Sequence, residues 1–91
     1  MDKEHLEKVK ELIQAEKAND ARELFNQIKE TESIEYFLIK GKLEQKFQNW
    51  GDAQNAFLRV LEIEPQNKEA QSRLQIIKGI LNFWNPEMFN P

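Results

Sequence analysis

The sequence contains no cysteine and a single histidine, His5. The lack of cysteine excludes disulfides, thiolate nucleophiles and cysteine-ligated zinc sites together. No nucleophile can be placed beside His5, which stands near the N-terminus, so we expect it to be a solvated helix residue. Catalysis that depends on cysteine or histidine is therefore not expected.

Long apolar runs are also absent. No stretch approaches the ~18 apolar residues that a membrane-spanning helix needs. The N-terminus has no cationic start followed by an apolar block, which is the pattern of a signal peptide. We therefore expect no membrane association and a cytoplasmic location.

An excess of positive charge is lacking as well. The 13 basic and 16 acidic residues give a net charge of −3, and Lys40, Lys42 and Lys46 are interleaved with Glu35 and Glu44. A nucleic-acid-binding surface needs a basic stripe that matches the phosphate spacing. No nucleic-acid partner is expected.

Patterns that would bind a metal or a cofactor, or support acid–base chemistry, are missing too. Nothing in the sequence forces the burial or like-charge crowding that tunes a pair of carboxylates for catalysis. Asp2, Asp20 and Asp52 are too scattered for a calcium loop, and no glycine-rich phosphate loop occurs. The sequence predicts no enzyme activity, no metal site and no cofactor.

The composition is that of a small helical domain. Of the 91 residues, 40% are hydrophobic and 32% are charged, and only three are glycine and three proline. This length accommodates one domain, and the scarcity of glycine and proline favours helices.

The most informative feature is a stretch that occurs twice. Residues 19–28 align with residues 51–60, an offset of 32. In both copies Asp-Ala is followed by a phenylalanine four residues after the alanine, then by a branched aliphatic residue three positions later. These residues share one helix face. Repetition at a fixed period predicts units that bury their apolar faces by stacking on each other.

Apolar periodicity and helix-breaking residues predict five helices. They lie at residues 3–16, from a cap at Asn19 or Asp20 to residue 28, from residue 34 to about 47, from about residue 50 to the residue before Pro65, and from a cap at Asn67 to about Trp84. Thr31-Glu32-Ser33 is a polar break that offers cap residues for the third of these helices. No segment shows the alternation of a strand. The predicted fold class is all-α, with two antiparallel hairpins and one further helix.

Residues 34–67 resemble a tetratricopeptide repeat, a helix-turn-helix unit of about 34 residues. The residues that match the motif are Phe37, Gly41, Trp50, Ala53, Phe57, Val60 and Pro65 to Asn67. Lys40 and Glu44 depart from it, because the family usually has an aliphatic and an aromatic residue there. The resemblance implies a right-handed superhelical stack of hairpins.

Two further parts of the chain extend the resemblance. Residues 2–33 resemble a degenerate first copy, in which Ala21, Phe25 and Ile28 match and Val9 replaces the glycine. Residues 68–84 resemble the first helix of a third copy, in the place of a capping helix. The predicted organisation is a repeat domain at 1–84 and an aromatic tail at 85–91.

Close packing within the better copy can be argued from the residues themselves. Gly41 has no side chain to hold off the second helix of its hairpin, and Ala53 and Ala56 are small on the other side. Phe37 and Phe57 then fill the space around this contact. We expect the two helices to approach each other most closely at Gly41.

The resemblance also implies a concave groove lined by the first helix of each hairpin. The residues carried over to that groove are Leu6, Lys10, Ile13, Gln14, Leu38, Lys42, Gln45, Lys46, Ser72, Arg73, Ile76 and Ile80. This surface would be apolar with several cations, which suits a protein or peptide ligand with apolar side chains and a carboxylate. Lys10, Lys42 and Lys46 would orient it. The alternative is that these lysines form an ordinary solvated face.

Co-chaperone members of the family grip a peptide C-terminus with a set of Lys, Asn and Arg residues. The corresponding positions here are Leu6, Lys10, Ile39, Glu69 and Arg73. Only Arg73 fits that set, so this clamp is not expected.

The aromatic tail allows two interpretations. Trp84, Met88 and Phe89 either cover the open end of a short array, or act as aromatic anchors for a partner or a second copy. The function predicted overall is a non-catalytic protein–protein interaction module with a binding groove. The alternative is a self-assembling structural unit, a homodimer formed through the tail or an exposed helix face.

Overall fold

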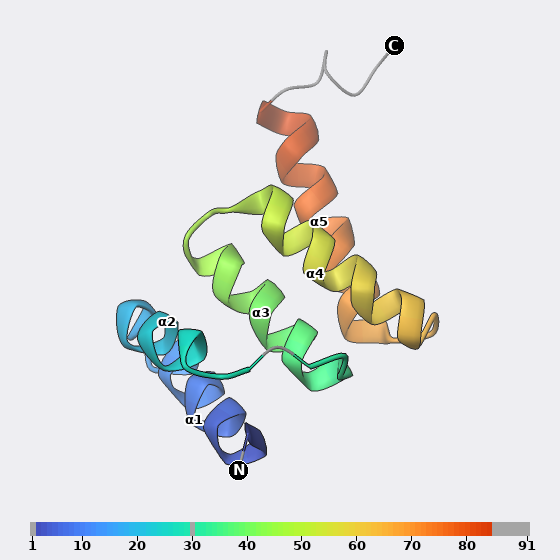
Figure 1. Ribbon diagram of the computed structural model, residues 1–91. Coiled ribbons are helices and arrows are strands. Elements are labelled where there is room, and N and C mark those ends of the chain that lie inside the picture. Colours follow the sequence, from blue (N-terminus) through green and yellow to red (C-terminus); the bar gives the residue numbers. More distant parts are fainter. Residues whose placement is uncertain (1, 30, 85–91) are drawn as a thin grey trace.

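The computed structural model describes residues 2–29 and 31–84, and in these residues the chain is helical without strands (Figure 1). The helices are α1 (Asp2–Gln14), α2 (Ala18–Asn26), α3 (Ile34–Lys46), α4 (Trp50–Ile63) and α5 (Lys68–Trp84). The predicted all-α class is confirmed. Among the described helices, none combines the length and the apolar character required to cross a membrane.

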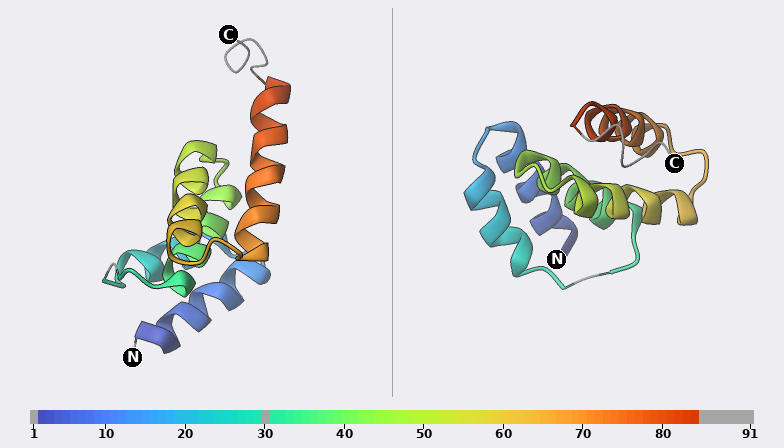
Figure 2. Two further views of the ribbon diagram at one scale, coloured as in Figure 1. Left: turned by 90° about the vertical axis from the view of Figure 1, so that its right-hand side faces the viewer. Right: turned by 90° about the horizontal axis from the view of Figure 1, so that it is seen from above.

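The helices form two hairpins and a lone helix. α1 and α2 lie antiparallel, as do α3 and α4, and α5 packs against α4 (Figures 1 and 2). The first hairpin joins the second because both α1 and α2 contact α3. The C-terminal half of α5 extends past the end of the α3–α4 hairpin, as Figure 2 shows.

The offset of 32 residues recurs in the backbone of the two hairpin turns. A left-handed residue stands two positions after the last residue of α1 and of α3, namely Glu16 (φ 61°) and Gln48 (φ 60°). The amides of the residues that follow, Lys17 and Asn49, reach back to the carbonyls of Leu12 and Glu44, each at 2.9 Å. This bonding closes a helix end without glycine. Both hairpins therefore use the same turn.

The side chains repeat with the same offset. Three pairs of residues separated by 32 positions are all buried: Ala21 with Ala53, Phe25 with Phe57, and Ile28 with Val60. Val9 and Gly41 form a fourth buried pair, with no side chain on the glycine. The repeat seen in the sequence is thus a repeat of core positions.

Helix starts agree with the predictions at two sites and differ at one. Ser33 caps α3 by accepting a hydrogen bond from the Tyr36 amide (3.1 Å), and Asn67 accepts one from the Ala70 amide at the start of α5 (2.8 Å). The predicted cap of α2 at Asn19 or Asp20 is wrong. The turn after α1 closes at Lys17, so α2 begins immediately, at Ala18, and no side chain caps it.

The α3–α4 hairpin closes on Gly41, as expected. A Cβ atom at Gly41 would lie 2.5 to 2.8 Å from three ring atoms of Phe57, closer than real carbon contacts allow. The ring of Phe57 is itself fully buried. The absence of a side chain at Gly41 therefore makes room for this ring.

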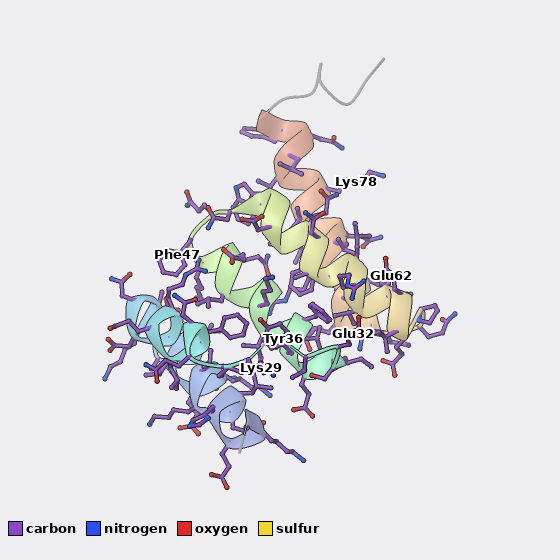
Figure 3. All side chains as sticks on the ribbon, in the orientation of Figure 1. Lys29, Glu32, Tyr36, Phe47, Glu62 and Lys78 are labelled. Carbon is purple, nitrogen blue, oxygen red and sulfur yellow. The ribbon has the colours of Figure 1, made fainter. Side chains whose placement is uncertain are left out.

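Glu44, the departure from the repeat motif, is a buried charge that links the two hairpins. Its carboxylate accepts two hydrogen bonds from Arg22 of α2 (2.9 and 3.0 Å) and one from the Asn49 side chain (2.9 Å). The Arg22 guanidinium also lies 4.6 Å from the centre of the Phe47 ring, which Figure 3 shows near the end of α3. The carboxylate at position 44 thus forms an ion pair between α2 and α3.

We expect Glu44→Gln to lower the free energy of unfolding by about 1–2 kcal/mol near neutral pH, because the partly buried Arg22 loses its counter-charge. The hydrogen bonds from Arg22, assisted by that from Asn49, hold the pKa of Glu44 below its ordinary value of 4.5. A lowered folded pKa stabilises the protein above 4.5, and this stabilisation is lost as the pH falls through the folded value.

Urea unfolding of wild type and Glu44→Gln, at about pH 7 and about pH 3, measures this difference. The gap between the two proteins should shrink at the acidic pH. Glu62→Gln is the control, since Glu62 pairs with Arg59 on the exposed surface (Figure 3) and should change stability little. An equal gap at both pH values would contradict the assignment of the effect to the carboxylate.

Candidate partner-binding groove

A hollow of about 470 Å³ lies between α1, α3 and α5. It is lined by Lys10, Ile13, Gln14 and Glu16 from the α1 end, by Ile39, Lys42, Gln45 and Lys46 of α3, by Trp50, and by Arg73, Ile76 and Ile80 of α5. We call this hollow the groove. It has the size of a typical ligand pocket, with apolar walls and a few polar groups.

Helix periodicity explains why these side chains share one hollow. Most lining residues of each helix recur at spacings of three or four, as in the run Arg73, Ile76 and Ile80 on α5, and α1 and α3 each add one adjacent pair, Ile13–Gln14 and Gln45–Lys46. Such spacing places them on one side of the helix. α1, α3 and α5 are the first, third and fifth helices of the chain, and each turns this side toward the hollow.

Most of the residues predicted for the groove lie in it. Those brought together are Lys10, Ile13, Gln14, Lys42, Gln45, Lys46, Arg73, Ile76 and Ile80. Leu6, Leu38 and Ser72 are not among the lining residues. Leu6 is buried in the core next to a separate hollow with Ile34, and Leu38 borders a small hollow with Glu7 and Glu69. Ser72 is exposed.

Three lining residues were not predicted from the sequence: Glu16, Ile39 and Trp50. Ile39 could have been found, because it precedes Lys42 by three positions and Lys46 by seven, and so shares their helix side. Leu38 lies one position away, which rotates its side chain out of the groove. Trp50 enters from the first residue of α4, a position that only the folding of the hairpin brings there.

The cations of the groove are not equally available to a ligand. Lys42 forms an ion pair with Glu69, and Lys46 forms one with Glu16 at 2.9 Å. Arg73 donates a hydrogen bond to the Gln45 side chain at 3.0 Å. Within the described residues, Lys10 has no ion-pair partner. Lys42 and Lys46, which we expected to orient a ligand, are thus each paired with a carboxylate of the same chain.

The residues predicted for tail docking fall largely outside the described part of the chain. Trp84 is the last residue of α5. Met88 and Phe89 lie in residues 85–91, outside the described residues. Both interpretations of the tail stay predictions.

Groups that could carry chemistry were sought elsewhere in the described residues. They contain no cluster of three or more His, Asp or Glu side chains that could hold a metal ion. His5 is exposed on α1.

Comparison with protein-family models, with curated proteins and with solved structures found no match for this chain. The tetratricopeptide resemblance thus stays a prediction that depends on the residues themselves.

Proposed function

We propose that this chain is a non-catalytic protein-interaction module of the tetratricopeptide type, which binds a peptide or a partner protein in the groove. The observation that carries the proposal is that α1 and α3, the first helices of two hairpins with the same turn, line one hollow together with α5. In the proposed superhelical stack, these helices form the concave side.

The lining favours a ligand that has both apolar and acidic groups. Ile76, which is exposed, and the partly exposed Ile80 offer apolar contacts. Removal of such surface from water drives association. Four cations and one carboxylate line the groove. Lys10 and Arg73 would orient an acidic group of the ligand, since charge complementarity contributes to specificity and to the rate of encounter.

Preformed helices suit this mode of binding. The groove is built from helices whose core-facing residues Val9, Leu43 and Ile77 are fully buried. A rigid surface loses little conformational entropy when a ligand docks, so more of the contact energy appears as affinity. Most of the conformational entropy lost on binding would be that of the ligand, which would bind as an extended segment or as a helix.

A photo-crosslinking residue placed at Gln14 in cells of the source organism tests the proposal. Gln14 is exposed and lines the groove, whereas Gln27, the matched position, is exposed after α2 and away from it. A partner crosslinked from position 14 but not from position 27 is the expected result. The same products from both positions would contradict a groove-specific partner.

Charge reversal gives the second arm of this experiment. Lys10→Glu combined with Arg73→Glu should reduce binding of the crosslinked partner, or of a peptide from it, at least about 10-fold, because each reversal replaces attraction by repulsion. The matched control is Lys8→Glu with Lys78→Glu, on the same two helices but outside the groove lining. Fluorescence polarisation measures both. Equal affinity in the two double variants would exclude the orienting role of Lys10 and Arg73.

A further inference from the structure

One face of α5 is exposed to solvent although it carries large apolar side chains. Ser72, Ile76, Gly79 and Phe83 are spaced by four, three and four residues, so they lie on a single side of the helix. All four are exposed, with Ile76 at 53% and Phe83 at 81%. We call these four residues the α5 seam. Its spacing is that of a helix that packs along another helix.

Gly79 is the least expected member of the seam. Glycine inside a helix is less stable than alanine, so a glycine at this position suggests that close packing requires it. A Cβ atom at Gly79 would meet nothing within 4 Å, unlike one at Gly41. No described contact inside the chain therefore requires a glycine here. It leaves the backbone of α5 open to close approach from outside.

The seam is also free of charge in a chain with 32% charged residues. Its polar neighbours on one side, Gln75 and Asn82, are neutral amides. Lys78, which Figure 3 labels on α5, is one position from Gly79 and so projects from a different side of the helix than the seam. The cores of protein interfaces are depleted of charge in the same way.

The order of small and large residues makes the seam complementary to itself. If a second α5 lies antiparallel, with the two-fold axis passing between positions 77 and 78, Ser72 faces Phe83 of the other copy and Ile76 faces Gly79. Every small residue then meets a large one. In a parallel pair the large residues would face each other and the small ones would leave gaps, so only the antiparallel pair fills the space evenly.

From this pattern we propose that two copies of the chain form an antiparallel dimer through the α5 seam. The contact is isologous, so each copy contributes the same residues and the assembly closes at two. The seam covers 12 residues, or about 18 Å of helix. Interfaces of this small size belong to the weak, transient class.

The proposed dimer lies next to the groove, but it does not depend on the proposed function. Ile76 belongs to both the seam and the groove lining, so the second α5 stands along one side of the groove. Ile80, next to the seam, would contact Ile76 of the other copy. Gly79 and Phe83 line no part of the groove, so variants at these positions separate dimer formation from ligand binding.

Sedimentation velocity of the full chain from roughly 5 µM to 1 mM tests the dimer. Wild type should shift from monomer to dimer across this range, and Gly79→Glu should stay monomeric. Gly51→Glu is the matched control, because Gly51 is also exposed on a helix with nothing near its missing Cβ, and it should dimerise like wild type. A monomeric wild type at all concentrations, or dimerisation of Gly79→Glu, would overturn the proposal.

Exchange of the small and large residues tests the packing itself. Gly79→Ile makes this face of α5 more apolar, so association driven by apolar surface alone would become stronger. The α5 seam predicts the opposite, a dimer at least 10-fold weaker, because the new side chain at position 79 would clash with Ile76 of the other copy. The double variant Ile76→Gly with Gly79→Ile restores a small residue opposite a large one. It should dimerise more tightly than Gly79→Ile alone, and failure to do so would reject the pairing.

The orientation can be read from cysteine crosslinks, since the natural sequence has no cysteine. Ser72→Cys mixed with Phe83→Cys should give a crosslinked heterodimer under mild oxidation, because the two positions face each other in the antiparallel pair. Each variant alone should crosslink poorly, as its two cysteines would lie far beyond disulfide distance. Efficient self-crosslinking of Ser72→Cys would show a parallel pair and overturn the proposed geometry.

Discussion

Phe57→Ala should lower the free energy of unfolding by about 3–5 kcal/mol, the range seen when a buried aromatic side chain is removed from a core. Phe57 is fully buried, and its ring covers Gly41 of the facing helix. Removal of the ring would leave a cavity bordered by a residue that has no side chain to collapse into it. For a domain of this size, such a loss corresponds to a melting temperature lower by at least roughly 12 °C.

Urea or thermal unfolding followed by circular dichroism measures this effect. Leu58→Ala is the matched control, because Leu58 is the next residue on α4 and is 44% exposed. It should cost well under about 1.5 kcal/mol, since its side chain is only partly removed from water in the fold. Similar midpoints for Phe57→Ala and wild type would rule out the packing of α3 on α4 described above.

Gly41→Ala should destabilise the domain by about 1–3 kcal/mol, although alanine is the better helix former. The added methyl group would lie 2.5 Å from the nearest ring atom of Phe57, so the ring or the helix must move. The same exchange at Gly79 meets open space and should stabilise the fold by about 0.5–1 kcal/mol. The two glycines of helices α3 and α5 should therefore respond with opposite signs.

Stability of both variants is measured at a low protein concentration, at which association does not contribute. The double variant Gly41→Ala with Phe57→Leu tests the cause, because a smaller residue at position 57 leaves room for the methyl group. The two changes should be less destabilising together than the sum of the single effects. Additive effects, or a stabilising Gly41→Ala, would show that the ring does not limit the approach of the helices.

The groove depends on this same contact. α3 supplies Ile39, Lys42, Gln45 and Lys46 to the lining, and α5 is held in place by packing on α4. A shift between α3 and α4 would therefore move one wall of the groove relative to the other. Variants of Gly41 should affect ligand binding even though Gly41 lines no part of the groove.

Most of the fold could be predicted because helices are encoded by short-range patterns. The spacing of apolar residues and caps such as Ser33 and Asn67 act within one or two turns. The start of α2 was predicted wrongly, because it depends on a backbone conformation that the residue types do not indicate. Glu16 takes a left-handed conformation that glycine usually marks, so no residue in the sequence indicated that the turn would close before Asn19.

The groove was predictable in part. Its expected lining was carried over by position from the tetratricopeptide resemblance, and most of those residues line the hollow. The availability of each cation was not predictable. Lys46 pairs with Glu16, 30 positions away, and Lys42 pairs with Glu69, and neither pair has a signature in the local sequence.

The sequence by itself determined the helices and the apolar positions that recur at an offset of 32, because both follow from the spacing of residues close along the chain. Only the tertiary structure decided which charges are paired, that Glu44 joins the hairpins through Arg22, and which apolar face of α5 stays exposed. Such contacts join residues far apart in the chain, and they exist only once the helices have packed.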